Sequence, residues 1–234
     1  MRKVLNSLEA KNKRERQRET LEKFIDSPVD FLVRHNISPN LLSYIGFFCS
    51  LAAAFFIAIG ATYFPIWFAW PAPFLIFWSG VFDVFDGEVA RKRGEETQAG
   101  AFLDSNLDRL SDAAIILGMI YGNLIHFLLG FFILFLILMI SYTRSRAENE
   151  DVDMKGVGLM ERAERLVYIM FILSFENWIY FLSLIFVKNL ILLFLTEYFF
   201  LFFILVFTGL LILTIGQRIV FTYKALRKSE VKVE

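Results

Sequence analysis

The sequence predicts an all-α membrane protein with six transmembrane helices preceded by an interfacial amphipathic helix. Of its 234 residues, 57% are hydrophobic, well above the share usual in a soluble domain. The charged residues gather in a few segments between long apolar runs. Residues 1–23 are rich in Lys, Arg and Glu and lack the apolar core of a signal peptide. We therefore expect the membrane spans themselves to direct insertion.

The pattern of charge and hydrophobicity divides the chain into four segments. Phe24 to Val33 is a mostly apolar stretch, too short to cross a bilayer and suited to lying in the headgroup layer. The predicted segments are a charged N-terminal arm (1–23), an interfacial helix (24–36), a six-span domain (37–226) and a cytoplasmic tail (227–234).

Six apolar stretches meet or approach the roughly 20 residues that a helix needs to cross the bilayer core. The first follows Ser38-Pro39-Asn40, a turn and helix-start signal. Pro71 and Pro73 disfavour an unbroken helix in the next stretch, so we expect the second span to begin near Pro73. The predicted spans are 41–60, 73–91, 101–122, 124–144, 162–187 and 198–223.

Cations lie on alternate connections between these spans. Residues 91–93, residues 144–165 and both termini are rich in Lys and Arg, whereas the connections around Tyr63, Asn123 and Lys188 carry almost none. The positive-inside rule then places both termini in the cytoplasm, at the plasma membrane. The basic segments flank membrane spans and lack a reading motif, so no nucleic-acid partner is expected.

Four aspartates fall inside or at the ends of the second and third spans. Asp83 and Asp86 are three residues apart, and Asp104 and Asp108 are four apart, so each pair shares a helix face. An ionisable residue at membrane depth costs roughly 2.5–3.5 kcal/mol on insertion scales, which favours a functional role. Four converging carboxylates require neutralising cations, and oxygen ligands suit Mg2+ or Mn2+. We therefore expect two ions, which could clamp a phosphoryl group between attacking and leaving oxygens.

Two other interpretations of the aspartates stay open at this point. The carboxylates could pair with interfacial cations, namely Arg91, Lys92, Arg93 and Arg109. Alternatively, acidic residues facing the interior of a bundle could line the cation path of a channel or transporter.

The aspartates belong to a longer pattern that resembles the signature of the CDP-alcohol phosphotransferase family. The pattern is Asp83-x-x-Asp86-Gly87-x-x-Ala90-Arg91, then eight residues, then Gly100-x-x-x-Asp104-x-x-x-Asp108. The resemblance implies a metal-dependent enzyme that transfers the lipid-phosphoryl group of a CDP-lipid to an alcohol and releases CMP. It also implies that Asp83, Asp86 and Asp104 ligate metal, and that Asp108 is both the general base and a fourth residue of the metal site.

The resemblance extends to a nucleotide-binding stretch before the first span. That stretch is Pro39-Asn40-Leu41-Leu42-Ser43, in which Asn40 and Ser43 supply polar groups that could equally cap the helix. The CDP-lipid-binding residues implied by the family are Asn40, Leu41, Leu42, Ser43, Gly87, Arg91 and Thr97.

Two further segments resemble the branch of the family that accepts inositol phosphate. They are residues 141–148 and 158–165, together with Gln217-Arg218 in the last span. The resemblance implies that Arg144, Arg165 and Arg218 hold the phosphate of the acceptor, and guanidinium groups can bind phosphate bidentately. The alternative is that such arginines anchor the membrane interface or pair with Glu148, Glu161 and Glu164. That alternative suits Arg146 and Arg162 better than it suits Arg218.

The expected reaction is therefore transfer from CDP-archaeol or CDP-diacylglycerol to inositol 1-phosphate. Glycerol 3-phosphate is the alternative acceptor. Serine ranks third, because it brings no phosphate for the arginines to bind. Gly118 and Gly122 are spaced for close helix contact, either within the subunit or in the homodimer that we expect. Membrane lipids are the remaining expected partners.

Overall fold

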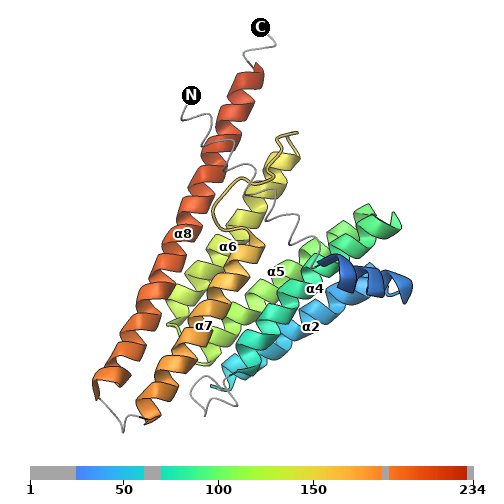
Figure 1. Cartoon of the computed structure of the whole chain (residues 1–234). Coiled ribbons are helices and arrows are strands. Elements are labelled where there is room, and N and C mark those ends of the chain that lie inside the picture. Colours follow the sequence, from blue (N-terminus) through green and yellow to red (C-terminus); the bar gives the residue numbers. More distant parts are fainter. Residues whose placement is uncertain (1–24, 61–69, 186–189, 231–234) are drawn as a thin grey trace, which may run out of the picture.

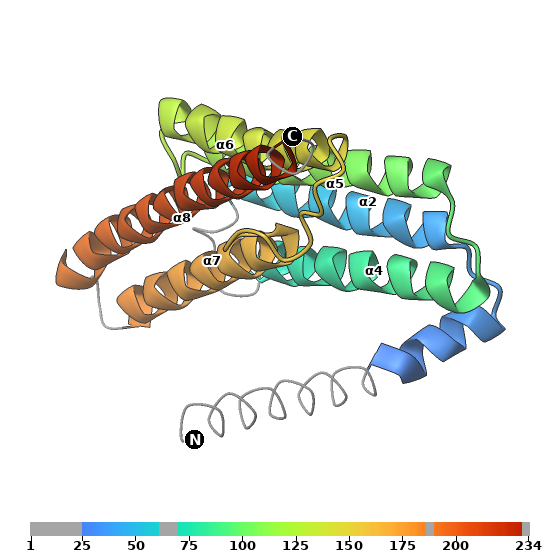
Figure 2. The same cartoon turned by 90° about the horizontal axis from the view of Figure 1, so that it is seen from above.

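The computed structural model describes residues 25–60, 70–185 and 190–230, and the part of the chain that it describes is all helical. Six long helices run alternately up and down in one bundle (Figures 1 and 2). They are α2 (Pro39–Ala58), α4 (Pro71–Arg93), α5 (Gln98–Tyr121), α6 (Phe127–Glu148), α7 (Arg162–Ile185) and α8 (Leu190–Glu230).

Contacts between neighbouring helices close the bundle into a ring. In order around it lie α2, α4, α7, α8, α6 and α5, and α5 returns to α2. Buried side chains from these helices, such as Ile76, Ile116, Ile137, Leu173 and Phe207, form one continuous apolar core. Because α2 packs against both α4 and α5, it holds the two aspartate-bearing helices beside each other.

Local signals explain where the helices near the site begin and end. Ser38 caps α2 by accepting a hydrogen bond from the Leu41 amide, and Pro39 occupies the first turn. Gly94 ends α4 in the left-handed region (φ 64°), and Thr97 caps α5 by accepting from the Gly100 amide at 3.0 Å. The same end of the bundle therefore collects the start of α2, the end of α4 and the start of α5.

Two helix boundaries differ from the predicted ones. The helix that carries Asp83 and Asp86 begins at Pro71 rather than near Pro73, because the first turn of a helix tolerates proline, which has no N–H to leave unpaired there. The last helix, α8, has 41 residues and continues through Glu230, so residues 227–230 of the predicted tail are helical. Figure 1 shows its C-terminal end rising beyond the rest of the bundle.

Four of the described helices are long and apolar enough to cross a membrane: α2, α6, and the stretches Arg162–Leu182 and Tyr198–Lys228 within α7 and α8. Large apolar side chains on the outside of the bundle, including Phe48, Phe55 and Phe171, are more than 60% exposed. Such a surface suits a hydrocarbon environment, so the chain is a membrane protein. The helices that carry the aspartates, α4 and α5, fall outside the apolar group.

Residues 25–34 form a short helix that packs on the ends of α2 and α4. Its Val29 is fully buried with Leu42 and Val89. Asp26 and Asp30 pair with Lys92 at 2.7 and 2.8 Å, and the hydrogen bond from Lys92 lowers the pKa of Asp30. The predicted charged arm, residues 1–23, lies outside the described residues.

Gly118 and Gly122 let α5 approach α2 within the subunit. A Cβ atom at Gly118 would lie 2.6 Å from the Ala54 carbonyl oxygen, and one at Gly122 would lie 2.2 Å from that of Ile57. These glycines therefore serve packing inside the chain, the first of the two uses that their spacing allows.

We expect Gly118→Ala to destabilise the protein by about 1–3 kcal/mol, because the new methyl group meets backbone that cannot rotate away. Gly209→Ala in α8 is the matched control, since nothing lies within 4 Å of its would-be Cβ. Thermal unfolding in detergent measures both variants. Equal melting temperatures for the two would contradict the close approach of α5 to α2.

Candidate active site

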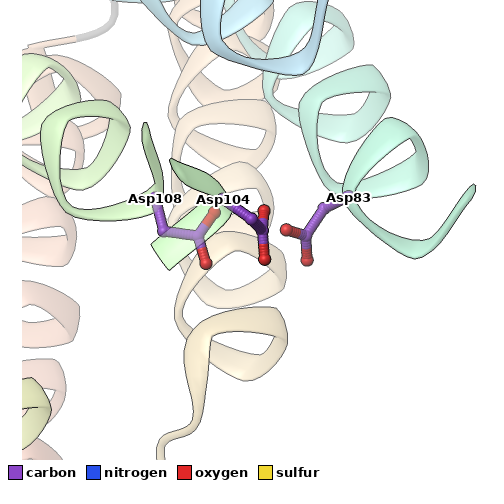
Figure 3. A group of neighbouring side chains, drawn as sticks. All are labelled: Asp83, Asp104 and Asp108. Carbon is purple, nitrogen blue, oxygen red and sulfur yellow. The ribbon is translucent and has the colours of Figure 1, made fainter. Parts of the chain in front are cut away.

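Three of the predicted aspartates meet between α4 and α5. One carboxylate oxygen from each of Asp83, Asp104 and Asp108 lies within 4.8 Å of the other two. The three side chains point toward one another from their two helices (Figure 3). The spacing of the aspartates along each helix, together with the packing of both helices on α2, produces this cluster.

The fourth aspartate, Asp86, lies at the edge of the cluster. It is only 5% exposed and accepts a hydrogen bond from the Ser43 hydroxyl at 2.5 Å. Ser43 and Asp86 thus join α2 to α4 beside the cluster. Asp86 lines a small cavity together with Asp83, Asp104 and Asp108.

A cation that was not predicted to belong to the site contacts the cluster. Arg162, the first residue of α7, places its Nη1 against Asp83 and 2.7 Å from Asp108. The four cations that could have paired with the aspartates have other partners. Arg91 pairs with Glu88, Lys92 with the N-terminal helix, Arg93 with Glu95, and Arg109 donates to Ser105.

One polar cavity, of about 430 Å³, opens beside the cluster at the ends of α2, α4 and α5. Among the predicted CDP-lipid-binding residues, Asn40, Ser43, Gly87, Arg91 and Thr97 line it, as does Asp104. The absence of a side chain at Gly87 leaves room beside the Arg91 guanidinium, whose nearest nitrogen would be 3.5 Å from a Cβ there.

Leu41 and Leu42 do not line this cavity. Leu42 is 1% exposed and packs in the apolar cluster with Val29 and Val89, while Leu41 is half exposed. Pro39, Asn40 and Ser43 of the predicted stretch line the cavity, because residues three or four apart lie on one side of a helix.

A second polar cavity, of about 390 Å³, lies on the other side of the cluster among α5, α6, α7 and α8. All three predicted acceptor arginines, Arg144, Arg165 and Arg218, line it. Asp104 and Asp108 reach it as well, and Asp104 is shared with the first cavity. The aspartate cluster is therefore the place where the two cavities meet.

Each of these arginines is held by a different partner. Arg165 forms a buried ion pair with Asp112 at 2.6 Å, with both side chains 5% exposed. Arg218 is also buried and donates to the carbonyl oxygens of Ile140 and Val157 at 2.7 and 2.9 Å. Arg144 pairs with Glu148, four residues on, at 2.8 Å, and is the most accessible of the three.

Asp112 is a residue of this wall for which no role was predicted. It continues the acidic face of Asp104 and Asp108 by one more turn of α5, a signal already present in the four-residue spacing. Arg162 had no such signal, because its partners lie on two other helices.

The donor set of the cluster fits a hard divalent cation. Three carboxylates converge, Asp86 stands beside them, and Mg2+ and Mn2+ prefer oxygen ligands of this kind. The contact of Arg162 with two members of the cluster shows that these carboxylates already attract positive charge.

An apolar cavity of about 390 Å³ lies between α4 and α7, beside Asp83. Gly80, Val84, Leu166 and Met170 line it together with Ile25 of the N-terminal helix. Asp83 lines it too, so this apolar cavity adjoins the aspartate cluster.

The structure thus combines a carboxylate cluster, whose donor set fits a divalent cation, with two polar cavities that meet at it inside an apolar helical bundle. Residues 36–196 match the family described as CDP-alcohol phosphatidyltransferase. The chain belongs to this family.

Two archaeal relatives are named archaetidylinositol phosphate synthase. The chain is 38% identical over 153 residues to the archaetidylinositol phosphate synthase of Methanothermobacter thermautotrophicus, covering 65% of this chain and 73% of the relative. The enzyme of that name from Pyrococcus horikoshii is 36% identical over 141 residues, 60% and 71% of the two chains.

The fold is also that of a solved bacterial relative. The crystal structure of Mycobacterium tuberculosis phosphatidylinositol phosphate synthase in complex with manganese and citrate has a TM-score of 0.63 at 23% identity, over 85% of this chain and 88% of that one. The structure of the same enzyme with CDP-DAG bound has a TM-score of 0.61, over 86% and 94%.

Proposed function

We propose that this protein transfers the lipid-phosphoryl group of a CDP-lipid to inositol 1-phosphate and releases CMP. The observation that carries the proposal is that Asp104 lines two polar cavities at once, one with Asn40 and Ser43 and one with three arginines. Such an arrangement lets a nucleotide donor and a phosphorylated acceptor meet at one carboxylate cluster. The names of the archaeal relatives support inositol phosphate as the acceptor.

In this reaction the first cavity holds the CDP group, with Asn40, Ser43, Arg91 and Thr97 around it and Gly87 leaving space for the diphosphate. The apolar cavity between α4 and α7 takes lipid chains. Asp83, Asp86 and Asp104 hold two divalent ions, Mg2+ or Mn2+, which neutralise the diphosphate and the charge that develops on it. Manganese in the solved relative supports this metal class.

Arg144, Arg165 and Arg218 bind the phosphate of inositol 1-phosphate, so that an inositol hydroxyl faces the cluster. Asp108 accepts the proton of that hydroxyl. The oxygen attacks the β-phosphorus of the CDP-lipid, the bond from this phosphorus to the bridging oxygen breaks, and CMP leaves with that oxygen.

The membrane arrangement belongs to the same proposal. We place α4 and α5 across the bilayer with the four apolar helices, since both pack along α2 in the same bundle. Residues 24–36 lie at the interface, where Lys92 ties them to the end of α4. The cation-rich end, with the active site and both termini, faces the cytoplasm at the plasma membrane. The homodimer stays a prediction, which chemical cross-linking in membranes would check.

CMP release by purified protein with Mg2+ and a CDP-lipid tests the function. Parallel reactions contain inositol 1-phosphate or glycerol 3-phosphate, each with CDP-archaeol and with CDP-diacylglycerol. We expect release only with inositol 1-phosphate. Release only with glycerol 3-phosphate would move the protein to the alternative acceptor, and metal flux into vesicles without CMP formation would favour a transporter.

A further inference from the structure

Arg162 bridges the aspartate cluster and the acceptor cavity. Its guanidinium contacts Asp83 on α4 and Asp108 on α5, while the same side chain lines the cavity of Arg144, Arg165 and Arg218. It is 14% exposed, against 29% and 25% for the two carboxylates. One arginine thus reaches both halves of the site from the start of α7.

The Arg162 guanidinium occupies the position that a divalent ion bound to the aspartate cluster would take. Asp83 and Asp108 are two of the three aspartates whose oxygens converge, and each has an oxygen in contact with Nη1 of Arg162. A divalent ion bound by the converging oxygens would lie within a few ångströms of this guanidinium, and the two positive charges would repel each other. Metal and Arg162 therefore compete for the same carboxylates.

The backbone at Arg162 is anchored, whereas its side chain is not fully held. The Met160 amide donates to Thr214 of α8 at 3.1 Å, and the Arg165 amide donates to the Glu161 carbonyl at 3.1 Å. The buried Nε of Arg162 has no hydrogen-bond partner among the described residues. A displaced side chain can therefore turn about a fixed start of α7, and the acceptor cavity that it already lines is the polar space open to it.

We propose that Arg162 is a tethered counter-cation of the aspartate cluster, which a divalent ion displaces into the acceptor cavity. Without metal it neutralises Asp83 and Asp108. With metal bound, its guanidinium joins the arginines facing the acceptor phosphate. Metal binding thereby prepares the acceptor site, and the two ligands are coupled through one side chain. The acceptor half of this inference rests on the proposed function, whereas the competition with metal does not.

Titration of the substrate-free protein with Mn2+ by calorimetry tests the competition. We expect Arg162→Gln to tighten Mn2+ binding about tenfold or more, because the competing charge is gone. Arg162→Lys keeps a charge and should stay close to the wild-type protein. Arg146→Gln is the matched control, since Arg146 is exposed and pairs with Glu150. Unchanged Mn2+ affinity in Arg162→Gln would overturn the proposal.

The coupling is tested by titrating inositol 1-phosphate with and without saturating Mn2+. In the wild-type protein we expect Mn2+ to raise the affinity for the acceptor by a factor in the range of about 5 to 150 usual for coupled sites. In Arg162→Gln this factor should shrink toward one. An equal factor in both proteins would overturn the displacement into the acceptor cavity.

A stability measurement keeps the test valid if Arg162→Gln folds poorly. In EDTA the variant leaves its carboxylates without their counter-ion, so it should melt below the wild-type protein, and saturating Mn2+ should restore it more than it stabilises the wild type. Equal Mn2+ stabilisation of both proteins would contradict the competition whatever the acceptor proves to be.

Discussion

Asp108→Asn is expected to lower the rate of CMP release by about 10²–10⁴-fold, the usual contribution of a general base. The amide keeps the size of the carboxylate but cannot accept the proton of the attacking hydroxyl. Asp108 lines the acceptor cavity and has an oxygen within 4.8 Å of Asp83 and Asp104, so the substitution acts where the hydroxyl must arrive. Initial rates at saturating CDP-lipid and inositol 1-phosphate measure the loss.

A control variant and a measurement of Mn2+ affinity are needed to interpret the rate of Asp108→Asn. Asp26→Asn removes an exposed carboxylate that pairs with Lys92, and it should leave the rate near that of the wild-type protein. Mn2+ affinity then separates the roles of Asp108. A lost rate with retained metal binding identifies a base, whereas parallel loss of both identifies a metal ligand. A rate within a few-fold of wild type would contradict either role.

Arg165→Met is expected to destabilise the protein by about 3–5 kcal/mol, the usual cost of breaking a buried ion pair. The substitution leaves Asp112 charged in a pocket where both side chains are 5% exposed. Chemical denaturation in detergent micelles, followed by tryptophan fluorescence, measures this loss. It should also abolish detectable turnover with inositol 1-phosphate, because the proposed acceptor site loses one of its two buried cations.

A double variant separates the structural role of this pair from its functional role. Arg165→Met combined with Asp112→Leu replaces both charges by apolar groups of similar size, which is often neutral or stabilising. We expect the double variant to regain most of the lost stability and none of the activity. If activity returns together with stability, Arg165 only supports the wall of the cavity and does not bind the acceptor.

Local spacing made much of the candidate site predictable. Asp83 and Asp86 share one helix face and Asp104 and Asp108 another by their separation in the sequence alone, so helical geometry predicts two acidic faces that can converge. The positions of the helices followed from apolar runs and caps. The errors at Pro71 and in α8 arose where a helix tolerates a proline in its first turn or continues beyond the apolar stretch.

Other parts of the site depend on which helix faces meet. The stretch from Pro39 to Ser43 could not show which of its residues face the cavity at the ends of α2, α4 and α5, and the fold turns Leu42 into an apolar cluster instead. The partners of Arg91, Lys92 and Arg109 could not be assigned from the sequence either, since the sequence offers several carboxylates to each of these cations.

The sequence by itself determined the membrane class and the carboxylate chemistry, because composition and short-range helical spacing carry that information, and the pattern from Asp83 to Asp108 carried the resemblance to the family. Only the tertiary structure decided that Asp86 bonds to Ser43, that Asp112 holds Arg165 and that Arg162 enters the aspartate cluster. Each of these contacts joins helices far apart in the chain. Their geometry comes from the packing of α2, α4, α5 and α7 against one another, which no local pattern of residues encodes.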